Sequence, residues 1–245
     1  MDAPSFADSI ERELEGLATP GRAPKEKAYL KSELRHLGTS VPAIRKVVKG
    51  ARRAFPDLDH HELIALVRAL WSEPVHERRM AAVEFLVLCG SLLRAEDVGL
   101  VEELIRESQT WALVDTLAVS VSGDLVERHP SLNTVLDRWS ADADLWIRRS
   151  SLLALLRPLR RGEGDFERFA RYADAMLDEE EFFIRKAIGW VLRETSKKRP
   201  DLVYSWLAPR TGRASGVTMR EAVRYLEPTR RDALMAAYKE GRAAL

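Results

Sequence analysis

The chain has 245 residues, a formal net charge of +1, 46% hydrophobic residues and 31% charged residues. This length suits one large domain or two small ones, and a charge so close to zero gives no global argument for a nucleic-acid partner. The single cysteine, Cys89, excludes an intrachain disulfide framework and a cysteine-built metal site, and we expect it to be buried. No apolar stretch approaches the roughly 20 residues that span a bilayer, so no membrane segment is expected.

Helical patterns follow one another along the chain. Residues 1–17 are acidic and amphipathic and lack the basic and apolar regions of a signal peptide, which favours the reducing cytoplasm. Apolar residues then recur at i, i+3, i+4 and i+7 in the segments 62–71, 76–88, 145–156 and 182–194. No alternating run is flanked by hairpin turns, and no linker is long or polar enough to separate domains. We therefore expect an all-α protein with one domain over residues 1–245.

A repeat becomes visible when the basic segments are aligned. One shared position is held in turn by Arg79, Arg149, Lys186 and Glu221, at intervals of 70, 37 and 35 residues. The first interval spans two periods, so one unit is missing, and its shared position falls at Asp115. This period predicts a curved solenoid of HEAT-like helix pairs, an α–α superhelix whose equivalent positions line one concave surface.

The shared position predicts a basic track along that surface. Arg79, Arg149 and Lys186 occupy it, and the nearest further cations are Arg148, Arg185 and Arg193. Arginine can bind phosphate through two hydrogen bonds, so such a track suits a polyanion. The alternative is an ordinary solvated face of charged helices. Arg-Arg and Arg-Lys pairs recur at equivalent positions of the repeat. This counts against the alternative, because charged residues on a solvated face need not recur at a fixed spacing.

Asp115 is the exception in this track, because a carboxylate there would repel a polyanion. Trp111 lies four residues earlier on the same helical face, and Trp190 lies four residues after Lys186. Two indole faces and an acid suit a cation, or positive charge that develops during a reaction. The alternative is structural: both tryptophans belong to the core and Asp115 pairs with Arg149. The residues alone leave both interpretations open.

Other catalytic and metal-binding patterns are missing from the sequence. There is no phosphate-binding glycine-rich loop and no nucleophile elbow. The five histidines show no ligand spacing; they are His36, His60, His61, His76 and His129. We therefore expect neither a metal ion nor a cofactor.

Six segments carry a resemblance to a known family, namely residues 29–49, 71–82, 111–130, 146–156, 182–194 and 219–226. The most specific of them reads FFIRKAIGWVLRE, from residue 182 to residue 194. Together they resemble the AlkD-like DNA alkylation repair glycosylases, which are all-α proteins of HEAT-like repeats. The resemblance covers roughly residues 25–228 and leaves residues 1–24 as an N-terminal helical cap.

The resemblance implies a function and a role for five residues. Matched by motif position, Asp115 is the catalytic acid, and Trp111 and Trp190 are the aromatics that flank the sugar. Arg149 matches a phosphate-contacting arginine and Tyr29 a DNA-contacting tyrosine. The family excises positively charged N3- and N7-alkylated purines from double-stranded DNA, without flipping the base into a pocket. A monomer that needs no cofactor is implied.

This chemistry agrees with the residues themselves. A cationic alkylpurine departs as a neutral base, so no general acid is needed. A carboxylate and two indole faces would stabilise the positive charge left on the deoxyribose, and the carboxylate could deprotonate the attacking water. No lysine Schiff base is required. We therefore expect a monofunctional enzyme of base excision repair, without lyase activity.

The sequence departs from the family pattern on both sides of Trp111. Thr110 stands where a second tryptophan is typical, and Ala112 stands where an acid is often found. These changes affect the expected substrate range and the local DNA contacts. Two other functions stay open on the same scaffold: a DNA-binding protein without catalytic activity, and a protein-interaction solenoid whose charge track is fortuitous.

Overall fold

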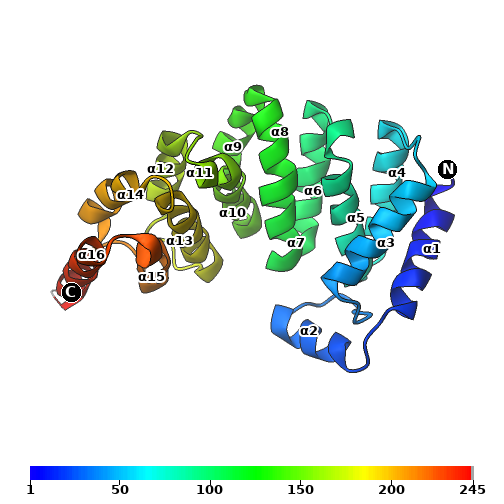
Figure 1. Ribbon diagram of the computed structural model, residues 1–245, viewed down its shortest axis with the longest axis horizontal. Coiled ribbons are helices and arrows are strands. Elements are labelled where there is room, and N and C mark those ends of the chain that lie inside the picture. The colour runs from blue at the N-terminus through cyan, green and yellow to red at the C-terminus, as the bar shows by residue number, and fades with distance from the viewer. Residues whose placement is uncertain (244–245) are drawn as a thin grey trace. The chain divides into compact units, whose positions relative to one another are not determined.

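A computed structural model describes residues 1–243 of the chain. These residues form helices and short connections, and their one β-bridge, between Arg35 and Val75, is isolated. The predicted all-α class is therefore confirmed (Figure 1). None of the helices described is long and apolar enough to cross a membrane.

The chain divides into two compact units, and each is described by itself. The first is Met1–Leu117, and the second begins at Ala118. The boundary falls where helix α7 (Trp111–Thr116) continues through a π-helical turn, Leu117–Ser122, into helix α8 (Gly123–Arg128). One domain over residues 1–245, and the curvature of the solenoid, stay predictions.

The first unit consists of helices α1 (Ala3–Gly16), α2 (Arg22–Leu30), α3 (Val41–Ala54), α4 (His60–Trp71), α5 (His76–Leu88), α6 (Val98–Ser108) and α7. Helix α4 begins with a capping box, in which Asp59 and Glu62 each accept the other's backbone N–H. Most of the apolar positions predicted in segments 62–71 and 76–88 lie in the core of this unit, although Val87 and Leu88 are exposed, and Cys89 is buried as expected.

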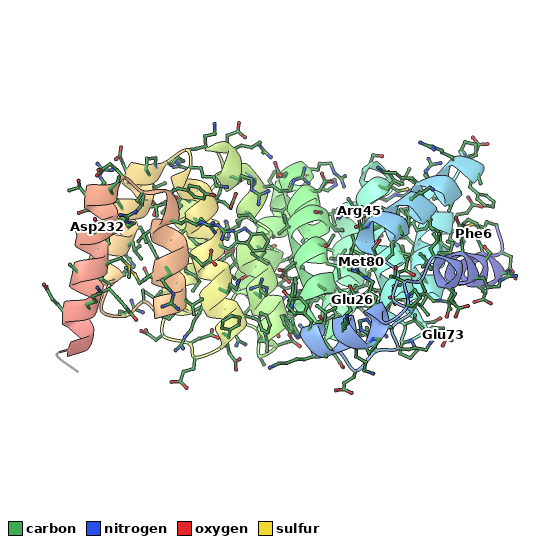
Figure 2. All side chains as sticks on the ribbon, turned by 60° about the horizontal axis from the view of Figure 1, so that its bottom comes forward. Phe6, Glu26, Arg45, Glu73, Met80 and Asp232 are labelled. Carbon is green, nitrogen blue, oxygen red and sulfur yellow. The ribbon has the colours of Figure 1, made fainter. Side chains whose placement is uncertain are left out.

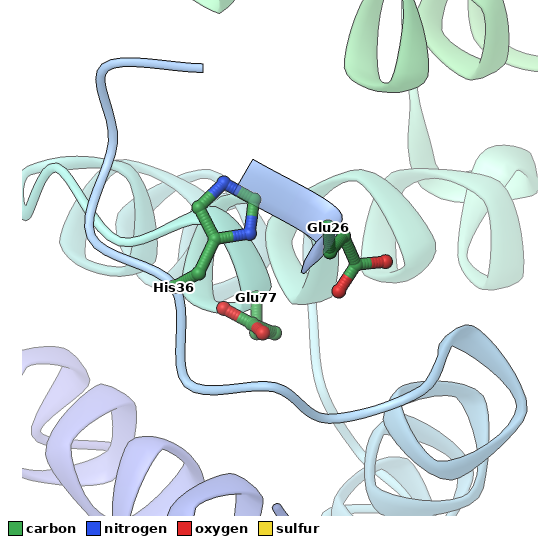
Figure 3. Close-up of side chains that lie close together, drawn as sticks. All are labelled: Glu26, His36 and Glu77. Atoms are coloured by element: carbon green, nitrogen blue, oxygen red, sulfur yellow. The ribbon is translucent and has the colours of Figure 1, made fainter. Parts of the chain in front are cut away.

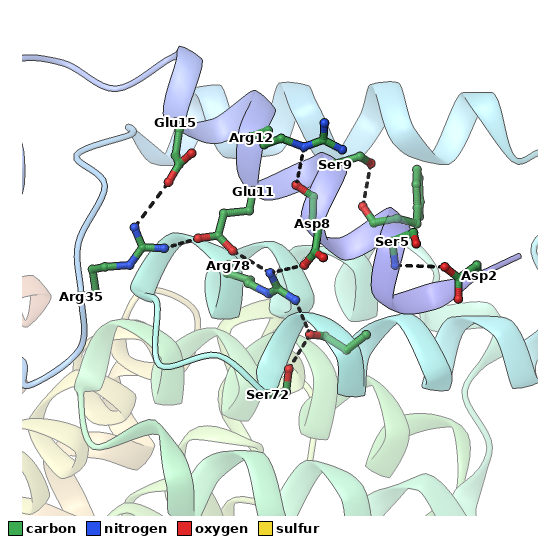
Figure 4. A network of polar contacts seen from close by, with 12 residues as sticks. Asp2, Ser5, Asp8, Ser9, Glu11, Arg12, Glu15, Arg35, Ser72 and Arg78 are labelled. Atoms are coloured by element: carbon green, nitrogen blue, oxygen red, sulfur yellow. Dashed lines mark hydrogen bonds and ion pairs between the residues drawn. The ribbon is translucent and has the colours of Figure 1, made fainter.

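Helix α5 lies at the centre of the first unit, in contact with α1, α3 and α4. Arg45 on α3 donates to Glu84 on α5 at 2.8 Å, and Figure 2 labels Arg45 together with Met80, a buried residue of α5. Arg78 on α5 is buried and donates to Asp8 at 2.9 Å and to Glu11 at 2.6 Å, both on α1 (Figure 4). These ion pairs fix α1, the first helix of the predicted N-terminal cap, to α5.

The second unit consists of helices α8, α9 (Asn133–Trp139), α10 (Leu145–Leu153), α11 (Leu156–Arg161), α12 (Phe166–Ala175), α13 (Phe182–Ser196), α14 (Pro200–Leu207), α15 (Gly216–Ala222) and α16 (Pro228–Ala243). Helix α13 is its centre and packs against α10, α11, α14 and α15. The segment 145–156 predicted as one helix is interrupted at Ala154 and Leu155. Pro158 explains the break, because it has no N–H to donate to the carbonyl of Ala154.

The predicted repeat corresponds to alternating helices. Helices α4, α6, α9, α12 and α14 are the first members of successive pairs, and α5, α7, α10, α13 and α15 are the second members. The residues of the shared position all lie on second members, and they are Arg79, Asp115, Arg149, Lys186 and Glu221. The unit predicted to be missing from the alignment is therefore the pair formed by α6 and α7.

Candidate active site

Trp111 and Asp115 lie one turn apart on α7, and both side chains are half-buried. The backbone is distorted on either side of this pair. Gln109 adopts a left-handed conformation with φ of 51°, and the π-helical turn begins at Leu117. Such distortions cost free energy and are enriched at functional sites. The local fold therefore presents an indole and a carboxylate on one face of a short, constrained helix.

Tyr29 lies against Trp111, while the DNA contact expected of it stays a prediction. The two rings meet edge to face, with centroids 5.9 Å apart and planes at 85°. Tyr29 belongs to α2 and is 72% exposed, so its hydroxyl and most of its ring are open to solvent. The first unit thus brings together three of the predicted site residues. Tyr29 and Trp111 are in contact, and Asp115 lies one helical turn from Trp111.

Thr110 is the N-cap residue of α7 but does not cap it through its side chain. Its hydroxyl is buried and has no hydrogen-bond partner among the described residues. A buried hydroxyl without a partner is destabilising. The departure from the family pattern at this position therefore leaves an unsatisfied polar group directly beside Trp111.

A surface groove of about 490 Å³ lies next to Tyr29. Arg22 and Lys25 on α2 contribute positive charge to it, and Glu26, which also lines it, pairs with Arg22 at 3.2 Å. The sequence analysis did not single out these two cations, because they lie outside the repeat and its shared position. The only signal for them was their closeness in sequence to Tyr29.

Arg149 lies on α10 of the second unit and is only 2% exposed. It donates a hydrogen bond to the backbone carbonyl of Phe183, and its guanidinium carbon lies 5.7 Å from the centre of the Phe183 ring. Phe183 therefore fixes the orientation of this guanidinium. The phosphate contact expected of Arg149 stays a prediction.

Trp190 and Lys186 lie one turn apart on α13, where Trp190 is half-buried and Lys186 is exposed. The Lys186 ammonium is 3.9 Å from a carboxylate oxygen of Glu221 on α15. Arg193 also binds this carboxylate. Glu221, which with Asp115 is one of two acids at the shared position, therefore offsets the charge of two predicted DNA-binding cations.

The other predicted cations also have intramolecular partners. Arg148 binds the carboxylate of Glu179 through two hydrogen bonds of 3.1 and 2.9 Å, and Arg185 donates to the Glu179 carbonyl at 2.7 Å. Arg79 donates to the carbonyl of Glu107 at 2.8 Å, and burial lowers its pKa. Within each unit, the predicted basic track is thus a set of mostly paired cations, of which Lys186 is the most accessible.

An aromatic cluster in the second unit was missed by the sequence analysis. The Trp146 and Phe183 rings lie 5.0 Å apart, and Phe183 meets Phe182 at 5.4 Å. Phe182 is 52% exposed, and the Lys186 ammonium lies 5.9 Å from the centre of its ring. The signal in the sequence was the pair of phenylalanines that opens the segment 182–194.

Solved structures share this fold at low sequence identity. A predicted DNA alkylation repair enzyme from Enterococcus faecalis is 23% identical, with a TM-score of 0.78, over 86% of this chain and 97% of its own. The protein smu.31 from Streptococcus mutans UA159 is 16% identical, with a TM-score of 0.61, over 91% and 100%. AlkD2 from Streptococcus mutans is 17% identical, with a TM-score of 0.57, over 92% and 100%. These similarities establish the helical-repeat fold.

The sequence itself identifies the family. No curated protein matches the chain significantly. The family model described as DNA alkylation repair enzyme matches residues 10–226, which is most of the chain and includes α7, α10 and α13. The chain therefore belongs to the DNA alkylation repair enzyme family.

Proposed function

We propose that this protein is a monofunctional DNA glycosylase, which hydrolyses the N-glycosidic bond of positively charged N3- and N7-alkylated purines in double-stranded DNA. Membership of the family supports a DNA alkylation repair enzyme. The observation that carries the finer proposal is the pair formed by Trp111 and Asp115, one turn apart on α7 and bounded by distorted backbone.

The proposed reaction begins with cleavage of the bond between the base and C1′ of the deoxyribose. The bonding electron pair goes to the cationic purine, which leaves as a neutral base, and positive charge develops on the sugar. The Asp115 carboxylate and the Trp111 face stabilise this charge. A water molecule then attacks C1′ and gives its proton to Asp115. The products are a free alkylpurine and an abasic site.

Residues of the second unit are assigned their roles by family resemblance. Trp190 supplies the second aromatic face at the sugar, and Arg149 binds the phosphate backbone. Accessible cations such as Lys186, and Tyr29 in the first unit, add further backbone contacts that do not depend on base sequence. We further propose that the protein acts as a monomer on nucleoid DNA in the cytoplasm.

Base release is the decisive measurement. Duplex DNA that carries N7-methylguanine is incubated with the wild type and with Asp115→Asn, and the free base is quantified. Asp115→Asn should lower the single-turnover rate at least about 100-fold, because it removes the charge that opposes the developing cation. Asp57→Asn, a change of the same kind at an exposed position, should leave the rate unchanged.

The other functions predict different outcomes of the same experiment. A DNA-binding protein without catalytic activity would bind the duplex but release neither N7- nor N3-alkylated bases. A protein-interaction solenoid would not bind DNA even at low salt. The product strand should stay intact until it is treated with alkali, and cleavage before that treatment would contradict the absence of lyase activity.

The proposal that the base is not flipped is tested separately. A pocket that encloses the base restricts its size, whereas a site that engages only the sugar does not. We therefore expect a bulky N7-alkyl adduct to be excised at a rate comparable with that of the methyl adduct. A strong loss of rate with adduct size, in an enzyme active on N7-methylguanine, would argue for an enclosing pocket.

A further inference from the structure

Three potential metal ligands from separate elements meet in the first unit. Glu26 comes from α2, His36 from the connection between α2 and α3, and Glu77 from the first turn of α5 (Figure 3). One donor atom from each of these residues lies within 4.8 Å of the other two. No ligand spacing in the sequence relates them, because His36 and Glu77 are 41 positions apart.

Several buried nitrogen and oxygen atoms of this cluster lack a hydrogen-bond partner among the described residues. Neither ring nitrogen of His36 has a hydrogen-bond partner in the part of the chain that the structure describes, and both are buried. The same is true of the Oε2 atom of Glu26, while its Oε1 atom accepts a hydrogen bond from Arg22 at 3.2 Å. Buried polar atoms in native proteins nearly always have a partner. A single ion could contact the Oε2 atom of Glu26 and one of the two His36 nitrogens.

Glu77 is held in place as a metal ligand would be. Its side chain is fully buried, and its carboxylate accepts backbone N–H groups from Leu37 at 2.9 Å, Gly38 at 2.6 Å and Thr39 at 3.2 Å. Gly38 is in the left-handed region, with φ of 92°, which lets the loop wrap around this carboxylate. A carboxylate offers about four lone-pair positions, and these three bonds leave one of them for a cation.

A second histidine supports the first. His76 is 2% exposed, and its ring stacks on that of His36 with centroids 4.5 Å apart and planes at 10°. Its Nδ1 atom also lacks a partner among residues 1–243. The stack holds the His36 ring in a fixed orientation beside the two carboxylates.

We propose that Glu26, His36 and Glu77 form a binding site for a divalent transition-metal ion of the Zn²⁺ type. One imidazole nitrogen and two carboxylate oxygens are ligands that such ions accept, whereas Mg²⁺ and Ca²⁺ prefer oxygen alone. At bond lengths of about 2.0–2.2 Å, tetrahedral ligands lie roughly 3.4 Å from one another. The cluster therefore needs only a small closure to bind the ion, with water completing the coordination.

The ion would act on the position of α2. Leu30 is the only buried residue of this helix, so little apolar packing holds it to the rest of the unit. A metal bridge from Glu26 to Glu77 would tie α2 to the central helix α5. Because α2 carries Tyr29, which meets Trp111, this bridge would also fix the tyrosine beside the candidate site. The metal site itself does not depend on the proposed glycosylase activity.

Zinc binding tests the proposal directly. The full chain is dialysed against chelator and then into buffer, and ZnCl₂ is titrated by calorimetry. One ion should bind per chain, and addition of Co²⁺ should produce visible absorption typical of nitrogen and oxygen ligands. His36→Phe preserves an aromatic ring against His76 and removes the two unsatisfied nitrogens. It should therefore fold and lose the site, with affinity reduced at least about tenfold.

Matched variants separate this site from adventitious binding. Glu26→Gln should weaken binding as His36→Phe does, whereas Glu33→Gln and His61→Phe, both at exposed positions, should not. Glu77 is not substituted, because its carboxylate also binds the backbone N–H groups of the loop at residues 37–39. Absence of zinc binding by the wild type, or binding that survives His36→Phe and Glu26→Gln, would overturn the proposal.

Protease protection tests the effect on α2. Trypsin can cleave at Lys25, Lys27 and Lys31, which are exposed on or just after this helix. Zinc should slow these cleavages several-fold in the wild type and have no such effect in His36→Phe. Zinc binding without protection of α2 would overturn the proposed bridge to α5.

Discussion

Equivalent positions of the repeat differ in their surroundings. Arg149 is buried and bound to the Phe183 carbonyl, Lys186 is exposed, and Arg79 is half-buried against Trp71. A repeat in the sequence preserves the place of a residue on its helix but not its neighbours. The charge that each position offers to a ligand is therefore set by its partners in the fold.

Lys186→Ala should weaken DNA binding without changing stability. The side chain is exposed and its nearest acid is 3.9 Å away, a pair that contributes at most about 1 kcal/mol. Loss of one phosphate contact should reduce the slope of log affinity against log salt by about 1. Fluorescence anisotropy with duplex DNA measures this slope, and Lys239→Ala at the exposed end of α16 is the control. An unchanged slope would place Lys186 outside the interface.

At the scale of elements, packing against α13 organises the second unit. Gly189 on α13 lies so close to α15 that a Cβ atom added to it would come within 2.7 Å of the Cβ of Glu221 and 3.1 Å of the backbone of Thr218. Only glycine permits this approach, and the approach brings Glu221 to Lys186 and Arg193. The sequence contained this glycine within the segment 182–194, but its packing role became visible only with α15 in place.

Gly189→Ala should therefore destabilise the protein, although alanine favours helix formation. Overpacking against backbone costs about 1–3 kcal/mol, which exceeds the gain in helix propensity of about 1 kcal/mol. Gly50→Ala is the matched control, because Gly50 lies on α3 with no atom near its missing Cβ. Urea unfolding should show a lower midpoint for Gly189→Ala and an equal or higher midpoint for Gly50→Ala. Equal effects of the two changes would contradict the close packing.

Asp174 on α12 should make the stability of the fold depend on pH in the acidic range. Hydrogen bonds from Arg210 hold the pKa of Asp174 below its ordinary value of 3.8, with the nearby charges of Arg210 and Arg213 as further causes. Because the folded-state pKa is lowered, this stabilisation is complete well above pH 3.8 and is lost as the pH falls through the folded value.

The variant Asp174→Asn tests this dependence. At pH 7 it should be less stable than the wild type by about 1 kcal/mol, since the carboxylate is about one-third exposed and partly screened. The difference should shrink at pH values below the lowered pKa, where the wild-type carboxyl is protonated. Thermal unfolding measured from pH 7 downwards shows this convergence. A difference that stays constant over the whole range would exclude the ionised form as its cause.

At the scale of the whole molecule, charges of opposite sign are mostly paired within the fold. The net charge is only +1, and two of the predicted DNA-binding arginines, Arg148 and Arg193, pair with the carboxylates of Glu179 and Glu221. Long-range attraction of DNA by net charge is therefore weak. We therefore predict that binding depends on local contacts, such as those that the exposed Lys186 and Lys25 can offer.

The salt dependence of DNA binding shows how many of these arginines leave their intramolecular partners to contact phosphates. If each of the six predicted cations contacted one phosphate, the counterions released would give a slope of about −5 for log affinity against log salt. We expect a clearly smaller magnitude for undamaged duplex between about 50 and 200 mM salt, because the paired arginines keep their intramolecular partners. A slope of −5 or steeper would show instead that those arginines exchange acids for phosphates.

The sequence by itself determined the helical class, the period of the repeat and the presence of the α6–α7 pair. These features depend on local periodicity, which a single stretch of chain encodes. It also placed Trp111 and Asp115 on one helical face, because four residues make about one turn. The break at Ala154 was predictable in principle from Pro158, whereas the π-helical turn after Asp115 left no comparable signal.

Only the tertiary structure decided which side chains meet. It paired Arg148 with Glu179 and Arg193 with Glu221, and it placed Tyr29 against Trp111. It also assembled Glu26, His36 and Glu77, three residues whose spacing suggested no metal site. The physical reason is that such contacts join helices distant in sequence, whose approach is set by packing of the whole unit rather than by local propensity.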